Sequence, residues 1–194
     1  GPQGPQCDVP ISFIDTSLEL LKNYNWGRDQ GMANFGGLES KRLIEKEAIG
    51  VVGCITPWNV PLQINLAKII PALSAGCSVV LKPAPDTPWS ATLIGAAANQ
   101  TDIPDGIINI VPSSDPQSIG EQLVNDPRVD MISFTGSTAT GRTIMSVAAR
   151  TVKKVFLELG GKSANIILDD ADFSQALLSA LAVCFHAGQG CAIQ

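Results

Sequence analysis

From Glu47 onward, short apolar segments alternate with longer segments of helical period, and this alternation limits the fold more than any other feature. The short segments have the length and the β-branched content of buried strands. They are "AIGVVGCI" (48–55), "CSVVLK" (77–82), "GIINIV" (106–111), "VDMISF" (129–134), "KKVFLEL" (153–159) and "ANIIL" (164–168). Helices are predicted between and after them, at 62–76, 87–100, 115–125, 138–150 and 172–188.

Residues that end and start helices support these boundaries. Gly76 is a plausible C-cap for the first helix. Thr87-Pro88 and Asp115-Pro116 each place an N-cap residue before a proline that suits the first helical position. The pattern therefore predicts an α/β fold with a parallel, doubly wound sheet covered on both faces and right-handed crossovers.

The chain divides into three parts by this pattern. Residues 1–46 contain a predicted amphipathic helix (11–27), a polar, Gly-rich stretch and a possible strand (40–47), and they cannot form a core alone. Residues 47–159 carry the regular alternation of predicted strands and helices. Residues 160–194 continue it with one more predicted strand and one more predicted helix.

Composition excludes several kinds of partner. Net charge is −5 and the charged fraction 16%, with lysines and arginines scattered, so neither nucleic acid nor a membrane surface is an expected partner. Five cysteines without a CxxC motif and a single histidine argue against a metal site. The odd number and wide spacing of the cysteines favour reduced thiols in the cytoplasm.

Ligands of doubly wound sheets bind at the carboxyl ends of the strands, so the residues after each strand are the candidates for function. Asn59 lies in the turn "TPWNVP", where its amide could donate to a developing oxyanion; a turn asparagine that satisfies its own backbone is the alternative. Lys82 ends a buried strand and could reach a ribose or a phosphate, or it could be a surface lysine.

The last two strands end in further candidates. Gly136 and Ser137 begin a helix in "TGSTATG", where free N–H groups favour a phosphate, although such helix starts are common. Glu158 alternates with apolar residues in its strand, and a desolvated carboxylate there would have a raised pKa suited to a general base. A solvated glutamate on an edge strand is the alternative.

Cys191 follows an apolar helix in the glycine-rich segment "GQGC". A thiol in such a turn is a candidate nucleophile if its environment lowers its pKa from about 8.5. Cys184, within the apolar helix, is expected to be an inert core residue, and His186 is expected to be structural.

Taken in order, "PWNVP", "KPAPDTP", "FTGSTATG", "LELGGKS" and "GQGC" resemble the aldehyde dehydrogenase superfamily. The resemblance covers nearly the whole chain from about residue 47, and residues 1–46 resemble that family's helix and oligomerisation strand. It implies an NAD(P)-dependent oxidation of a small-molecule aldehyde to an acid, with NAD as the expected cofactor and NADP possible. It also implies a homo-oligomer, a Rossmann-like dinucleotide-binding domain at residues 47–159 and the start of a second α/β, catalytic domain at residues 160–194.

The resemblance assigns a role to each candidate. Cys191 matches the nucleophile, Asn59 the oxyanion donor and Glu158 the base that activates water. Lys82 matches the ribose-binding lysine, and Gly136 and Ser137 match the pyrophosphate site. The full set that it assigns to the cofactor cleft is Thr56, Trp58, Lys82, Pro85, Gly136, Ser137, Thr140 and Leu159.

Two departures from the family pattern stand out. The family often has a glutamate three residues after the lysine, where it disfavours a 2′-phosphate; here that position is Pro85, followed by Asp86. Family members are also well over twice as long, so the chain is expected to be a fragment without activity of its own. A non-catalytic dinucleotide-binding module and an interaction fragment are the competing readings.

Overall fold

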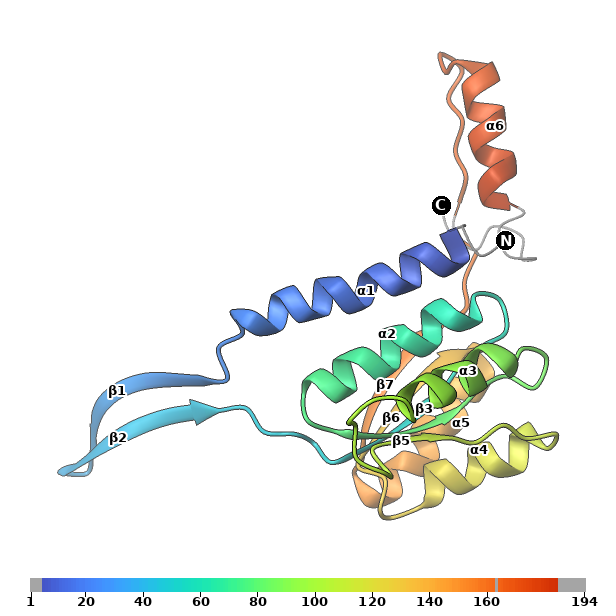
Figure 1. Ribbon diagram of the computed structural model, residues 1–194. Helices are drawn as coiled ribbons and strands as arrows, with labels where there is room; N and C mark the ends of the chain where they lie inside the picture. Colours follow the sequence, from blue (N-terminus) through green and yellow to red (C-terminus); the bar gives the residue numbers. More distant parts are fainter. Residues whose placement is uncertain (1–4, 163, 185–194) are drawn as a thin grey trace.

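A five-stranded parallel sheet forms the centre of the molecule (Figure 1). The computed structural model describes residues 5–162 and 164–184. The strands run in the order β5-β4-β3-β6-β7, so the chain starts in the middle of the sheet and winds outward in both directions. This doubly wound α/β sheet confirms the predicted fold class. The bounds of the five strands are β3 Val51–Ile55, β4 Ser78–Lys82, β5 Ile108–Ile110, β6 Met131–Gly136 and β7 Lys154–Leu159.

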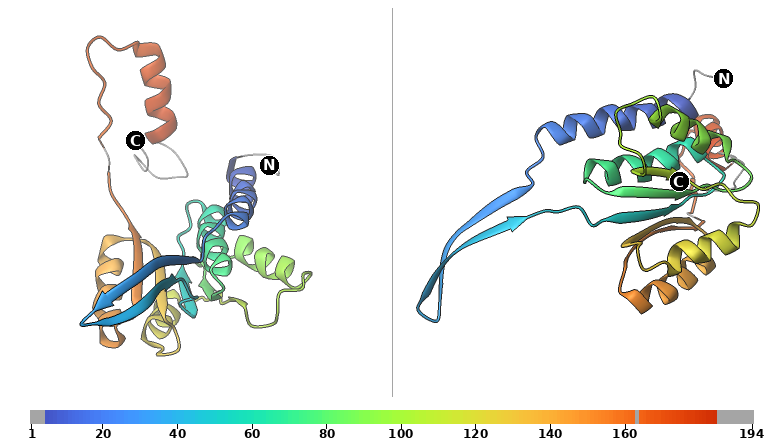
Figure 2. Two further views of the ribbon diagram at one scale, coloured as in Figure 1. Left: turned by 90° about the vertical axis from the view of Figure 1, so that its left-hand side faces the viewer. Right: turned by 60° about the horizontal axis from the view of Figure 1, so that its bottom comes forward.

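Helices cover both faces of the sheet because the strands carry apolar side chains on both faces. On one face, α2 (Pro61–Ser74) and α3 (Trp89–Ala98) pack over a core that includes Cys54. On the other face, α4 (Pro116–Asn125) and α5 (Thr138–Ala148) pack over a core that includes Ile55. A short 3₁₀ helix, η1 (Ala149–Thr151), leads from α5 to β7. The right-hand view of Figure 2 shows the two layers on opposite sides of the strands.

Two of the three predicted helix caps are confirmed. Gly76 follows the end of α2 with a φ of +79°, and its N–H donates to the carbonyl oxygen of Leu73. The side chain of Asp115 accepts from the backbone N–H of Ser118 at the start of α4. The predicted cap at Thr87 is wrong: α3 begins one residue later than that cap requires, and the buried hydroxyl of Thr87 has no partner in the described part of the chain.

The N-terminal residues form a helix and a projecting hairpin. α1 (Pro5–Lys22) packs along α2, and β1 (Gly27–Phe35) pairs antiparallel with β2 (Leu38–Glu45). The two strands extend away from the sheet as an arm (Figure 1). Gly36 and Gly37 make the turn with φ values of +60° and +84°, a combination that only glycine adopts readily and that matches the twist of a two-residue hairpin.

Beyond β7 the chain leaves the sheet, and the last described element is α6 (Phe173–Cys184). Residues 164–168, predicted as a strand, have no strand conformation, and this prediction is wrong. A strand needs a hydrogen-bonded neighbour, and no described segment pairs with these residues, so Ile166 and Leu168 are exposed. Within the described ranges no helix has the length and apolar content to cross a membrane.

Candidate active site

The register of the sheet aligns the candidate residues at one edge. Ile55 lies beside Lys82 on one side and beside Phe134 on the other, and Phe134 lies beside Leu157. The residues that directly follow Ile55, Phe134 and Leu157 in the chain therefore occupy the next row. They are Thr56, Thr135 and Glu158. This row is the carboxyl edge of the sheet, where doubly wound folds bind ligands.

A cleft of about 630 Å³ opens at this edge, towards the face that α4 and α5 cover. Its volume is in the range of small-molecule and cofactor sites. Leu159 lies outside its lining and packs beneath Gly141 of α5 instead. The other residues that the sequence assigned to the cofactor all line it: Thr56, Trp58, Lys82, Pro85, Gly136, Ser137 and Thr140.

One end of the cleft is the N-terminus of α5. Ser137 caps this helix, and its hydroxyl oxygen accepts from the backbone N–H of Thr140 at 3.2 Å. Gly136 precedes the cap, and a Cβ atom there would lie 2.5 Å from the ring of Phe134. The backbone thus passes close over an aromatic ring, and the free N–H groups of the first helical turn face a space suited to an anion.

Lys82 is buried at the end of β4, with 5% of its surface exposed. Its Nζ donates to the carbonyl oxygen of Pro83 at 3.2 Å, and burial lowers the pKa of this amine. One acceptor leaves the amine with further hydrogen-bonding capacity, because a lysine ammonium carries three donors. Lys82 is therefore a buried cation in the cleft wall, not a surface lysine.

A buried polar network fixes Thr56, the first residue after β3. Its hydroxyl donates to Oδ1 of Asn65 at 2.7 Å, and Nδ2 of Asn65 lies 3.5 Å from the hydroxyl of Ser90. The backbone N–H of Thr56 also donates to the carbonyl oxygen of Lys82 at 3.2 Å. Helices α2 and α3 therefore hold the cleft edge of β3 in place.

Asn59 lies in the turn that leads into α2 and is half-buried. Its side-chain oxygen is buried and accepts no hydrogen bond from any described residue, so the expected satisfaction by its own backbone is not observed. A buried amide oxygen without a donor is costly, and such groups cluster at functional sites. Asn59 is not part of the cleft lining.

Glu158 lies on the α2 face of β7, opposite the cleft, and its side chain is exposed. The desolvation that the strand alternation predicted is therefore absent, and this prediction is wrong for the described structure. β7 is the last strand of the sheet, and no described segment covers Phe156 or Glu158. The alternation itself is confirmed, because Val155, Leu157 and Leu159 pack into the opposite core.

Sequence reasoning missed Lys68, which lies on the same face as Glu158. Lys68 is only 8% exposed, and its Nζ donates to the hydroxyl of Ser133 at 3.0 Å and lies 5.9 Å from the ring centre of Phe156. Burial lowers the pKa of Lys68, while attraction to Cys54 and Glu158 opposes the change. The helical period of α2 could have predicted the burial of Lys68. This residue falls on the buried face of the helix, with Asn65, Leu66, Ile69 and Ala72.

Burial also decides the state of a neighbouring thiol. Desolvation raises the pKa of Cys54 to about 12, and attraction to Lys68 offsets only part of this effect. Cys54 is therefore a neutral core residue. Cys191 and His186 lie outside the described residues, so the structure neither brings Cys191 to Asn59 and Glu158 nor separates it from them.

The cleft fits an extended ligand with an anionic centre and an apolar end. The N-terminus of α5 and Lys82 supply positive potential near the carboxyl edge. Val124, Ile144 and Val147, between α4 and α5, supply an apolar surface at the other end. A dinucleotide has this combination of a pyrophosphate and an adenine ring, so the residues present fit such a cofactor.

Comparison with known proteins shows that the chain is similar to dehydrogenases that act on aldehydes. The chain is 42% identical over 187 residues to 3-succinoylsemialdehyde-pyridine dehydrogenase of Pseudomonas sp, covering 96% of this chain and 37% of that protein. It is 46% identical over 154 residues to a probable succinate-semialdehyde dehydrogenase [NADP(+)] of Sinorhizobium fredii, covering 79% and 31% respectively.

A solved structure of aldehyde dehydrogenase C from Pseudomonas syringae, in complex with NAD+ and octanal, superposes with a TM-score of 0.82 at 40% identity, covering 96% of this chain and 36% of that one. The chain thus spans roughly a third of the length of the relatives that it matches. Residues 9–194 match the model of the aldehyde dehydrogenase family, and the chain belongs to that family.

Proposed function

We propose that the full-length protein carrying this sequence oxidises a small aldehyde to the carboxylic acid with NAD(P)+. Family membership supports this proposal, and the observation that carries it is the cleft at the carboxyl edge, where Lys82 and the N-terminus of α5 offer a cradle for a dinucleotide. Similar proteins include one solved with NAD+ and one named for NADP+. When bound, the nicotinamide supplies a hydride acceptor.

In the proposed reaction, the thiolate of Cys191 attacks the aldehyde carbonyl and forms a carbon–sulfur bond. The side-chain amide of Asn59 and the backbone N–H of Cys191 donate to the oxygen that becomes negative. Loss of hydride from the same carbon leaves a thioester on Cys191. Glu158 then takes a proton from water, the water oxygen attacks the thioester, and the acid leaves as the thiolate is restored.

The unsatisfied oxygen of Asn59 supports its place in this scheme. It is buried without a donor among the described residues, and buried polar groups left unsatisfied in this way are found at functional sites. Glu158 is exposed on the same face of the sheet as Lys68, where water can reach its carboxylate.

Removal of the proposed nucleophile tests the reaction. In the full-length protein, Cys191→Ala should reduce aldehyde-dependent NADH formation by at least about 10³-fold, because no thioester can form. The dissociation constant for NAD+ should change by less than about threefold, since the cleft is intact. Cys7→Ala, a thiol in α1, is the matched control and should retain full activity. Substantial turnover by Cys191→Ala would remove the nucleophile from the proposal.

Replacement of the proposed base separates the two halves of the reaction. Glu158→Gln should leave a rapid burst of NADH, one per active site, followed by a phase slowed by about 10²–10⁴-fold, because general-base catalysis contributes factors of that order. Rapid-mixing absorbance at 340 nm measures both phases. Equal slowing of the burst and of the later phase would contradict a role confined to hydrolysis.

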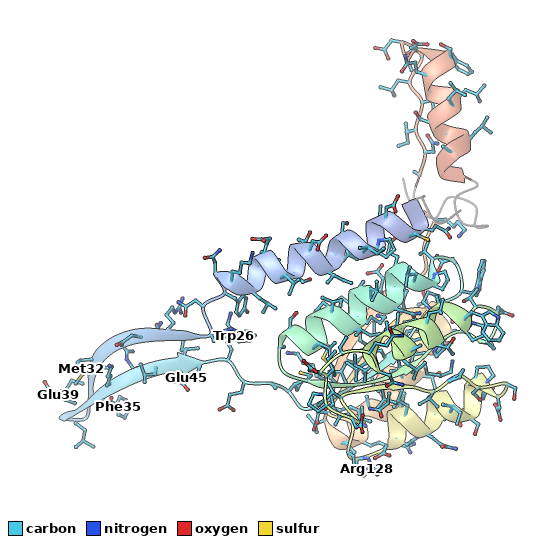
Figure 3. All side chains as sticks on the ribbon, in the orientation of Figure 1. Trp26, Met32, Phe35, Glu39, Glu45 and Arg128 are labelled. Atoms are coloured by element: carbon cyan, nitrogen blue, oxygen red, sulfur yellow. The ribbon has the colours of Figure 1, made fainter. Side chains whose placement is uncertain are left out.

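We also propose that the parent protein is a homo-oligomer and that the β1–β2 arm packs on a second copy. A two-stranded hairpin with both faces in water is marginally stable, yet this arm exposes large apolar side chains along its length. The apolar side chains of the arm that expose 46% or more of their surface are Met32, Phe35, Leu38, Leu43 and Ile44. Figure 3 places Met32 and Phe35 on the part of the arm farthest from the sheet.

A further inference from the structure

The lining of the cleft contains two charged side chains, Lys82 and Glu121. Lys82 is the buried cation in its wall, whereas Glu121 is an exposed anion on α4 at its rim. The remaining described residues that line the cleft are polar without charge or apolar. A ligand that carries an additional negative charge therefore meets one carboxylate in this cleft, and that carboxylate belongs to Glu121.

The packing of α4 brings Gly120, the residue before Glu121, against Lys82. A Cβ atom on Gly120 would lie 3.9 Å from Cδ and Cε of Lys82, so this turn of α4 passes over the lysine stem. Glu121 is the next residue, and its Oε1 accepts from Nε2 of Gln117 at 3.0 Å. Gln117 and Val124 also line the cleft, so Glu121 belongs to the helix face that is turned towards it.

The other acidic candidate near the lysine does not reach the cleft. Pro85 occupies the third position after Lys82 and lines the cleft without any charge. Asp86 follows it, but its side chain is exposed and is not part of the lining. The segment from Pro83 to Asp86 thus supplies no carboxylate to the cleft.

We propose that Glu121 is a specificity-determining residue that disfavours a phosphate on the 2′ position of the adenosine ribose, and so favours NAD+ over NADP+. This inference rests on the proposed dinucleotide site. The ribose joins the adenine to the pyrophosphate, so it would lie between the apolar end of the cleft and the N-terminus of α5. Lys82 and Glu121 are the charged side chains among the described residues that line this cleft.

Charge repulsion and hydrogen bonding at Glu121 would both favour NAD+ over NADP+. A 2′-phosphate carries about −1.5 to −2 charges at pH 7, and a nearby carboxylate repels it. A 2′-hydroxyl is neutral and can donate to the same carboxylate. Lys82 would attract the phosphate, but its ammonium is shared with the carbonyl oxygen of Pro83 and its burial disfavours the charged form.

Equilibrium binding without aldehyde tests the inference independently of catalysis. NAD+ and NADP+ are titrated by calorimetry into the full-length protein and into its Glu121→Gln, Glu121→Lys and Asp86→Asn variants. Glu121→Gln should tighten NADP+ binding by about tenfold, the order expected for one carboxylate beside a phosphate at a water-exposed rim. NAD+ binding should change by less than about threefold.

The other two variants sharpen the result. Glu121→Lys should tighten NADP+ binding further, because it replaces repulsion with attraction. Asp86→Asn removes the same charge from a position outside the lining and should alter neither affinity. An unchanged NADP+ affinity in both Glu121 variants would overturn the inference while leaving the dinucleotide site intact. A wild-type protein that binds neither dinucleotide would instead overturn the proposed function on which it rests.

Discussion

Lys68 is a charged side chain that the fold holds against the apolar face of the sheet. Its ammonium has one hydrogen-bond partner among the described residues, the hydroxyl of Ser133, and the ring of Phe156 at 5.9 Å. Burying a charge in this way costs free energy unless nearby groups of opposite charge compensate. The exposed carboxylate of Glu158 provides such attraction on the same face.

The desolvation of Lys68 predicts a particular dependence of stability on pH. Because its pKa is lower in the folded protein, the unfolded chain binds more protons between that pKa and 10.5. The free energy of unfolding therefore rises with pH in this window. In the full-length protein, the Tm of Lys68→Met minus that of wild type should fall by about 2 °C between pH 7.5 and pH 10.

Scanning calorimetry at several pH values measures this difference. Lys154→Met, which removes an exposed lysine from β7, is the matched control, and its Tm difference should stay constant across the same range. A Tm difference for Lys68→Met that stays constant, or that grows with pH, would contradict a pKa lowered by burial.

At the scale of single residues, sequence reasoning succeeded where local backbone geometry decides the outcome. Ser137 follows a strand and begins a helix, and that position alone exposes N–H groups to a ligand. Lys82 was found by the same reasoning, but its burial was not, because the covering turn comes from α4, about forty residues later in the chain. The predicted burial of Glu158 is wrong for the corresponding reason, because the exposure of this side chain depends on which segments lie beside β7.

At the scale of elements, the strand and helix alternation of residues 47–159 could be predicted because each unit is specified by its own period. Each apolar run pairs with neighbours of the same kind, so the parallel sheet follows from the pattern. The segment 164–168 has the same composition but lacks a described partner, and composition alone cannot supply one. A strand is a property of a pair of segments, which a single segment's sequence does not contain.

The β1–β2 hairpin illustrates the opposite error. The sequence suggested one possible strand near residues 40–47 and a polar stretch before it, yet β1 (Gly27–Phe35) occupies most of that stretch. The signal was the dipeptide Gly36-Gly37 between two strand-compatible segments, a typical hairpin turn. The composition of β1 predicts a loop instead of a strand, because glycine and polar residues lower its strand propensity.

At the scale of the whole molecule, the arm has more exposed apolar surface than its own structure can stabilise. Its two strands pair with each other and with no other described strand, and both outer edges are open. At its end, Phe35 and Leu38 are directly paired across the turn and are 88% and 76% exposed. Open edges and apolar tips of this kind promote association between chains, which agrees with the proposed homo-oligomer.

Replacing this apolar pair with opposite charges tests the role of the arm while preserving the hairpin. In the full-length protein, Phe35→Glu together with Leu38→Lys should keep a favourable cross-strand pair next to the turn but add two charges that must be desolvated in any interface. Light scattering after gel filtration should then show a lower mass than for wild type, with dissociation at concentrations at least about tenfold higher than those at which wild type dissociates. Leu93→Lys, a substitution at an exposed position of α3 that is 69% accessible, is the matched control and should leave the mass unchanged. If the double variant kept the wild-type mass at every concentration, the arm would not be an oligomer contact.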